Sequence, residues 1–203
     1  MKILLAVDGS KHGRGATEWI SQIPFATAPQ VTALHVVDVV SLRAPFMVQP
    51  VVVGIERFIQ AEIKRLETLG TKVVAETKEL LSSMNLQGKV IIERGTVASS
   101  ILKRAPKRNG VVVVGSRGLD TLDRFMLGSV STQVTQHAPC SVLVVKEAAR
   151  PLRRIVLTID GSTASQKAVQ FLLRKMGPNT VDPSEGTVPI QVAVVHVMPY
   201  LDY

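Results

Sequence analysis

The chain of 203 residues has almost no cysteine and few aromatic residues. Cys140 is its only cysteine, which excludes an intrachain disulfide and a cysteine-rich metal cluster. Aromatic residues make up 4% of the chain and hydrophobic residues 46%, so the core must be aliphatic. An aliphatic core is typical of parallel strands that helices bury on both faces. The apolar neighbours of Cys140 indicate a small buried side chain rather than a reactive thiol, and an intracellular, reducing compartment is the simplest interpretation.

Long hydrophobic runs are also missing. The apolar run at residues 3–7 is too short for a signal peptide. Charged residues and prolines interrupt the apolar segment 31–54, which excludes a membrane span there. We therefore expect a cytoplasmic protein that does not use a membrane as a partner.

Acidic residues are outnumbered, with 16 Asp and Glu against 24 Lys and Arg, which gives a net charge of +8. Such a charge could attract nucleic acid. However, the basic residues are scattered singly or in pairs, and no aromatic residues lie between them to stack on bases. A solvated basic surface is the better interpretation, and nucleic acid is not expected as a partner.

Apolar runs alternate with amphipathic stretches through the first 147 residues. The runs predict strands at 3–7, 31–37, 89–93, 111–114 and 142–145. Helical spacing of apolar residues predicts helices at 15–23, 54–85, 96–105 and 129–137. This alternation predicts an α/β fold with a five-stranded parallel sheet and helices on both faces. Ligands bind such sheets beyond the carboxyl ends of the strands, where Asp8, Val36 and Gly115 fall.

The chain repeats its opening unit. The string I-L-L-A-V-D-G-S at 3–10 returns as I-V-L-T-I-D-G-S at 155–162, which makes Asp160 the copy of Asp8. A helical pattern and a second strand follow in both units. We therefore expect a nucleotide-binding domain at 1–147 and a partial second unit at 151–203. The second unit lacks a glycine loop and its own fifth strand. Its size predicts that it is either packed against a neighbouring subunit or poorly ordered.

The most specific motif follows the fourth predicted strand. It reads Gly115-Ser-Arg-Gly118, then nine residues, then Gly128-Ser129. Glycines let backbone approach a ligand closely, and the amides and dipole of a following helix attract anions. The string is neither a Walker A loop nor the dinucleotide pattern G-x-G-x-x-G. A tight turn is the structural alternative, but the cationic Arg117 in the same loop favours a phosphate chain as the ligand.

Together these residues resemble the universal stress protein family over residues 1–147, with a truncated second copy at 151–203. The resemblance rests on V-D-G-S at 7–10, L-H-V at 34–36, V-V-G-S-R-G at 113–118 and H-A-P-C-S-V at 137–142. The spacing G-x2-G-x9-G-[ST], which marks the family's ATP-binding branch, is satisfied. The resemblance implies strand order 3-2-1-4-5, ATP as ligand, and Mg²⁺ or Mn²⁺ bound through its phosphates. It also implies homodimers joined through the strand from Val142 to Val145.

Site residues follow from the same resemblance. Asp8 would contact the ribose or adenine, near Ala6 and Val7, and Val36 would contact adenine through its backbone. Gly115 and Gly118 would line the ribose and first phosphates. The phosphate tail would be held by Gly128, Ser129 and Val130. Arg117 and Arg124 are added as phosphate contacts from their charge alone.

Several of these residues have a structural alternative. Asp8 either binds ligand or caps the turn after its strand, whereas Asp160 is expected only to cap. Asp120 and Asp123 either recruit a metal or belong to a solvated loop, so the metal ligands are unknown. Ser129 either caps a helix, binds phosphate, or does both.

Two classes of function remain open. The first is an ATP-binding regulatory or stress-response protein in which the nucleotide is a signal. No residue is assigned as catalytic, because no general base faces a γ-phosphate and the Walker lysine is missing. The second is a slow ATPase or another adenine-nucleotide-processing enzyme on the same fold, using a bound metal and a positioned water. His35 and His196 are expected to be packed and hydrogen-bonded rather than catalytic.

Overall fold

The computed structural model describes residues 1–43, 55–107, 109–117, 127–176 and 189–196. Contacts within the chain divide it into two compact units. Unit 1 comprises Met1–Ser21 and Pro29–Ala149, and unit 2 comprises Gln22–Ala28 and Arg150–Tyr203. None of the described helices is long and apolar enough to cross a membrane.

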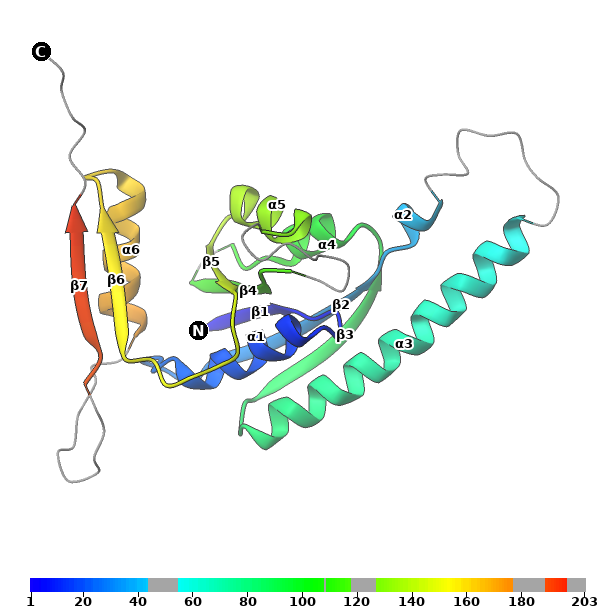
Figure 1. Cartoon of the computed structure of the whole chain (residues 1–203), viewed down its shortest axis with the longest axis horizontal. Coiled ribbons are helices and arrows are strands. Elements are labelled where there is room, and N and C mark those ends of the chain that lie inside the picture. Colours follow the sequence, from blue (N-terminus) through cyan, green and yellow to red (C-terminus); the bar gives the residue numbers. More distant parts are fainter. Residues whose placement is uncertain (44–54, 108, 118–126, 177–188, 197–203) are drawn as a thin grey trace, which may run out of the picture. The chain divides into compact units, whose positions relative to one another are not determined.

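Unit 1 contains a five-stranded parallel sheet in the predicted order β3-β2-β1-β4-β5 (Figure 1). Its strands are β1 (Lys2–Ala6), β2 (Gln30–Val37), β3 (Gly88–Arg94), β4 (Gly110–Gly115) and β5 (Ser141–Val145). Each lies within one residue of its predicted bounds, because each contains a short apolar run. Val111 to Val114 of β4, which lies between β1 and β5, are all buried.

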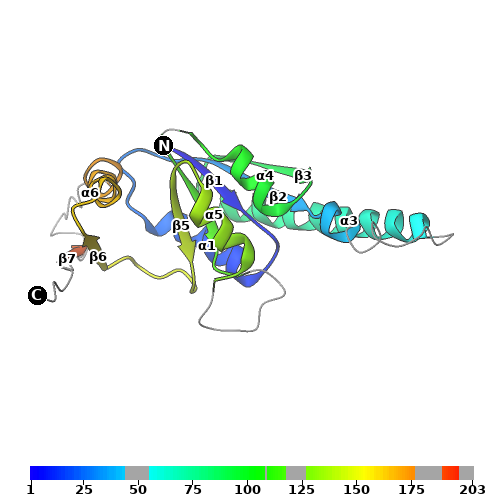
Figure 2. The ribbon, with the colours of Figure 1, turned by 90° about the horizontal axis from the view of Figure 1, so that it is seen from above.

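Helices cover both faces of this sheet, with α4 and α5 on one face and α1 and α3 on the other (Figures 1 and 2). They are α1 (Lys11–Gln22), α2 (Val39–Arg43), α3 (Ile55–Ser83), α4 (Val97–Arg104) and α5 (Ser129–His137). The sequence predicted four of them. The short helix α2 was missed, although Asp38 caps it by accepting hydrogen bonds from Ser41 N at 2.9 Å and Ser41 Oγ at 2.8 Å.

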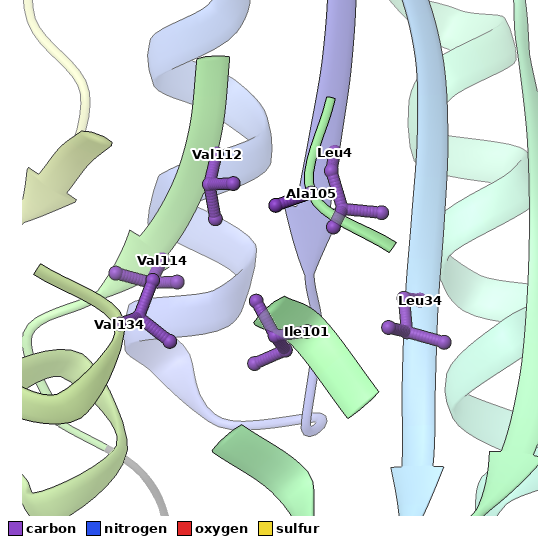
Figure 3. Packing of buried hydrophobic residues seen from close by; sticks show 7 residues of the cluster. All are labelled: Leu4, Leu34, Ile101, Ala105, Val112, Val114 and Val134. Atoms are coloured by element: carbon purple, nitrogen blue, oxygen red, sulfur yellow. The ribbon is translucent and has the colours of Figure 1, made fainter. Parts of the chain in front are cut away.

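An aliphatic cluster fills the space between the sheet and the helices α4 and α5. Figure 3 shows side chains from β1, β2 and β4 that converge with Ile101 of α4, which is 1% exposed. The cluster consists of Leu4, Leu34, Ile101, Ala105, Val112, Val114 and Val134. Because it holds α4 against the ends of β1, β2 and β4, this cluster fixes the side of the sheet where the candidate site lies.

Helix α3 packs along β2 and β3 on the opposite face and reaches the turn that follows β1. A Cβ built on Gly9 of that turn would lie 2.8 Å from Cγ2 of Val73 in α3. Ion pairs add surface links from β3 to both layers, Arg94 with Glu67 of α3 and Arg104 of α4 with Glu93. Exposed pairs of this kind contribute at most about 1 kcal/mol each, so apolar packing dominates.

Unit 2 has the elements that the repeat predicted. They are β6 (Arg154–Ile159), α6 (Thr163–Lys175) and β7 (Gln191–His196), and the two strands pair in parallel. Ser162 caps α6 by accepting a hydrogen bond from Ser165 N at 3.1 Å. No residue of α6 is buried and every residue of β7 is exposed. The described part of unit 2 therefore has the helix and strands that the repeat predicted, but it has little hydrophobic core.

Candidate functional site

A cavity of about 230 Å³ lies at the carboxyl ends of β1, β2 and β4 in unit 1. The cavity is lined by nine of the ten site residues that were predicted from the sequence: Ala6, Val7, Asp8, Val36, Gly115, Arg117, Gly128, Ser129 and Val130. The tenth, Gly118, lies outside the described residues, as do Asp120, Asp123 and Arg124. Segments separated by more than a hundred residues thus meet at one edge of the sheet, which is the edge that the topology predicts.

Part of the cavity wall was not foreseen from the sequence. Leu34, Val114 and two residues of α4, Val97 and Ile101, supply an aliphatic wall. The α4 residues are four positions apart, and this spacing indicates only a helix face turned toward a core. The folded structure is needed to show that this helix face packs beside the ends of β2 and β4 and so borders a cavity.

Arg117 gives the cavity a buried cationic atom. Its Nε is buried and has no hydrogen-bond partner among the described residues, and the residue lines the cavity. The neighbouring Ser116 Oγ is also buried without a partner in the same part of the structure. Burying a guanidinium nitrogen without an acceptor is costly, so this part of the cavity favours a hydrogen-bond acceptor such as an anion.

The first turn of α5 borders the same cavity. Gly128 is the N-cap residue, with φ −67° and ψ 162°, and it supplies no side-chain cap. Ser131 Oγ donates to Ser116 O at 3.0 Å, which ties the helix start to the end of β4. Ser129 is therefore the first helical residue and not the cap, which removes one of its two predicted roles. The first amides of a helix lack internal partners, so this end of α5 favours an anion.

The structure gives Gly115 a second reason to be glycine, independent of a ligand. A Cβ there would lie 2.9 Å from Cβ of His12 and 3.1 Å from its carbonyl carbon, so α1 itself requires a glycine. At Gly128 a Cβ would meet Ser116 O at 3.4 Å, an ordinary contact. The fold does not demand glycine at Gly128, and close approach of a ligand remains the hypothesis for that residue.

Asp8 makes the turn contact that the sequence allowed and also borders the cavity, so its ligand-binding role stays a prediction. Its Oδ1 accepts a hydrogen bond from Ser10 N at 2.9 Å, which closes the turn after β1, and the residue also lines the cavity. Asp160 makes the same turn contact with Ser162 N at 2.9 Å. Asp160 is exposed, and hydrogen bonds from Ser162 lower its pKa to about 2. The copy is a cap, as expected.

The remaining candidate side chains have structural roles. His35 Nδ1 lies 2.9 Å from Val7 O, so this histidine is packed and hydrogen-bonded as expected. His196, in contrast, is exposed, because its strand has no covering layer in the described part of unit 2. Cys140 is half-buried against the aliphatic cluster, and burial raises the pKa of its thiol.

Comparison with known proteins gives this architecture its family. The model of the universal stress protein family matches residues 1–146. The chain belongs to the universal stress protein family. The universal stress protein YxiE of Bacillus subtilis is 31% identical over 146 residues, which are 71% of this chain and 98% of that protein.

Two further comparisons extend this result. A universal stress protein of Mycolicibacterium smegmatis is 29% identical over 184 residues, covering 89% of this chain and 61% of that relative. The chain thus spans less than two thirds of that relative's length. The solved structure of the protein MJ0577 superposes with a TM-score of 0.61 and 25% identity, over 73% of this chain and 97% of that one.

Proposed function

We propose that unit 1 binds adenine nucleotides, with ATP as the ligand, and that the protein is a nucleotide-dependent regulatory or stress-response protein. The observation that carries the proposal is the cavity in which buried Arg117 Nε has no acceptor among the described residues. The uncapped start of α5 offers a second anion-binding group beside it. This combination suits a phosphate chain, and its spacing matches the family's ATP-binding branch.

The rest of the cavity suits a nucleoside. The aliphatic wall of Leu34, Val97, Ile101 and Val114 would pack on the faces of a base. Strand β2 continues past the last paired residues of β1 and β2, Ala6 and Leu34. The backbone of Val36 therefore faces the cavity where β1 no longer pairs with it. An adenine edge, with one donor and one acceptor, would find its partners there.

Asp8 would accept a hydrogen bond from a ribose hydroxyl at the boundary between the two ends of the cavity. A divalent ion, Mg²⁺ or Mn²⁺, would be held through the phosphates. Within the described ranges, no group of three or more His, Cys, Asp or Glu could hold a metal by itself. In this proposal the nucleotide is a signal, and its hydrolysis is at most slow.

Calorimetry with ATP, GTP and inorganic tripolyphosphate tests the proposal. We expect ATP to bind most tightly and tripolyphosphate to bind detectably, because Arg117 and α5 act on phosphates alone. Absence of ATP binding in the presence of Mg²⁺ would overturn the proposal. Mass spectrometry of nucleotide released from the purified protein and a phosphate-release assay distinguish a bound signal from a substrate: intact ATP supports the first, and repeated turnovers support an ATPase.

We also propose that residues 151–203 form a partial second universal stress protein unit. Its strand, Asp-Gly-Ser turn, helix and parallel strand repeat the opening of unit 1, and the match to the M. smegmatis relative extends over 184 residues. The exposed apolar side chains Val156, Leu173 and Val194 indicate that this unit needs further cover. If the protein is a monomer at micromolar concentration and proteolysis leaves residues 151–203 intact, the unit does not need cover from another subunit.

A homodimer through Val142 to Val145 is the corresponding proposal for unit 1. Strand β5 is an edge of the sheet, so its outer backbone groups lack a strand partner within the described sheet. Proline cannot donate to such a ladder. The backbone of Val144 faces this open side, because Ser116 N donates to Val145 O and alternate residues of β5 therefore face β4. Light scattering should show a dimer that Val144→Pro converts to a monomer, while a dimer that survives this change uses another surface.

A further inference from the structure

His35 lies beside the candidate site, on β2, between two residues that line the cavity wall. Leu34 and Val36 border the cavity, and His35 alternates with them, so its side chain belongs to the face of the sheet that α3 covers. Its imidazole does not touch the cavity. It instead reaches Val7, the first residue beyond β1, at 2.9 Å from Nδ1 to the carbonyl oxygen. Because a carbonyl only accepts, Nδ1 carries the proton and donates it.

The hydrogen-bond ladder between β1 and β2 shows what this bond replaces. Gln30 N donates to Met1 O at 2.8 Å, and Val7 N donates to Leu34 O at 3.0 Å. In a parallel ladder this pattern advances by two residues on each strand, so its next step would join Val36 N to Val7 O. The paired residues end at Ala6 and Leu34, and the Val7 carbonyl is bonded by His35 instead.

Helix α3 is shaped to admit this imidazole. Gly70 lies in the interior of the 29-residue helix, where glycine costs about 1 kcal/mol relative to alanine. A Cβ on Gly70 would lie 2.8 Å from Cδ2 and 3.0 Å from Nε2 of His35. The glycine therefore makes room for the ring, and the ring is held in place from the side opposite the cavity.

We propose that His35 is a positioning residue that keeps the backbone N–H of Val36 available to the base of a bound adenine nucleotide. By holding the carbonyl of Val7 on the α3 side of the sheet, the imidazole ends the ladder one step early and leaves the Val36 amide directed at the cavity. Without this donor the carbonyl can turn back to accept from Val36 N, which closes the base edge. The inference rests on the proposed nucleotide function and adds a residue that sets base recognition without touching the ligand.

The test compares two substitutions of His35 by calorimetry with ATP and inorganic tripolyphosphate. His35→Leu removes the donor, and His35→Asn places an amide nitrogen near the position of Nδ1. We expect His35→Leu to weaken ATP roughly tenfold, which corresponds to about 1.4 kcal/mol, while tripolyphosphate affinity stays within about twofold. His35→Asn should stay close to the wild type for both ligands. His196→Leu, at the matching position of unit 2, is the control and should change neither.

Each outcome bears on one proposal. A wild type that does not bind ATP overturns the nucleotide function itself. A wild type that binds ATP, together with a His35→Leu variant that weakens ATP and tripolyphosphate equally, shows a merely structural histidine and overturns the inference. An unchanged ATP affinity in His35→Leu does the same.

Amide exchange of Val36 in the wild type gives a second test that needs no variant. The amide should exchange quickly in the ligand-free protein and slowly with ATP bound. Strong protection without ligand would mean that Val36 N–H already has a partner, and the inference would fail.

Discussion

The two Asp-Gly-Ser turns of this chain have the same local geometry and different surroundings. Gly9 has φ +81° and Gly161 has φ +80°. In both turns the aspartate accepts a hydrogen bond from the serine amide two residues later, at 2.9 Å. Yet a Cβ on Gly9 would meet Val73 of α3, whereas one on Gly161 would meet nothing within 4 Å. The local sequence therefore determines the shape of the turn. The packing of α3 and the neighbouring strands around the first turn makes only that turn part of a cavity.

The strands before the two turns differ in the same way. Ile3, Leu4 and Leu5 of β1 are 3% exposed or less, whereas Val156 of β6 is 66% exposed. A repeated sequence can therefore supply a repeated strand, turn and helix without supplying a second site. The described part of the second copy contains neither a glycine loop nor the helices that would wall a cavity.

The largest expected effect comes from adding a methyl group to each turn glycine. Gly161→Ala pays only for the left-handed backbone conformation, about 1–2 kcal/mol. Gly9→Ala adds crowding against Val73, and overpacking costs about 1–3 kcal/mol more. Urea unfolding followed by circular dichroism should show this difference. Equal losses of stability would mean that α3 yields at Val73 without cost and would remove the packing contrast between the turns.

Arg117 offers the next test, because the described part of unit 2 contains no counterpart to it. Hydrogen bonds to charged groups contribute about 1.5–3 kcal/mol, so Arg117→Met should weaken ATP and tripolyphosphate about ten- to a hundredfold. The ligand-free variant should be at least as stable as the wild type, since a buried unpaired nitrogen is removed. Calorimetry and thermal melting measure the two effects. Unchanged affinity for both ligands would show that the phosphates do not reach this guanidinium.

The strands and the cavity show how much could be predicted from the sequence. The strand bounds were predictable because each strand is a short apolar run, and nine nominated site residues do meet at one cavity. Helix α1 begins at Lys11, four residues before the predicted start. Two glycines, Gly13 and Gly15, hid its first turn, which Ser10 caps through Gly13 N at 3.1 Å. Tertiary packing there outweighs low helix propensity.

Other features of the site depend on contacts that no local pattern contains. The charge of Arg117 was visible in the sequence, but its unpartnered burial depends on how β4 and α5 meet. The spacing singled out Gly115, but it contained no sign that a side chain there would collide with His12 of α1. Val97 and Ile101 looked like core residues and are also cavity wall. The Asp38 cap of α2, in contrast, was a usable signal that the sequence reading passed over.

A smaller effect is expected at the two turn aspartates. Asp8→Ala and Asp160→Ala both remove the turn hydrogen bond, so their difference isolates the cavity role of Asp8. Loss of one hydrogen bond to ligand costs about 1–2 kcal/mol, so Asp8→Ala should weaken ATP about five- to thirtyfold. Asp160→Ala should leave the affinity unchanged. Equal weakening by the two substitutions, measured by calorimetry, would remove Asp8 from the site.

The smallest effect concerns the acid titration of the exposed turn. Hydrogen bonds from Ser162 lower the pKa of Asp160 from 3.8 to about 2, since they favour the charged carboxylate. A group whose folded pKa lies below its unfolded value adds stability above the unfolded pKa and loses it as the pH falls through the folded one. The contribution of Asp160 should therefore be intact above about pH 4 and disappear between about pH 4 and pH 2. Because the group is fully exposed, the change in unfolding free energy should be slight.

NMR titration of the carboxyl carbon of Asp160 is the more sensitive measurement. In Ser162→Ala the titration midpoint should move up toward the ordinary value, and a midpoint that stays near 2 would show that Ser162 does not set it.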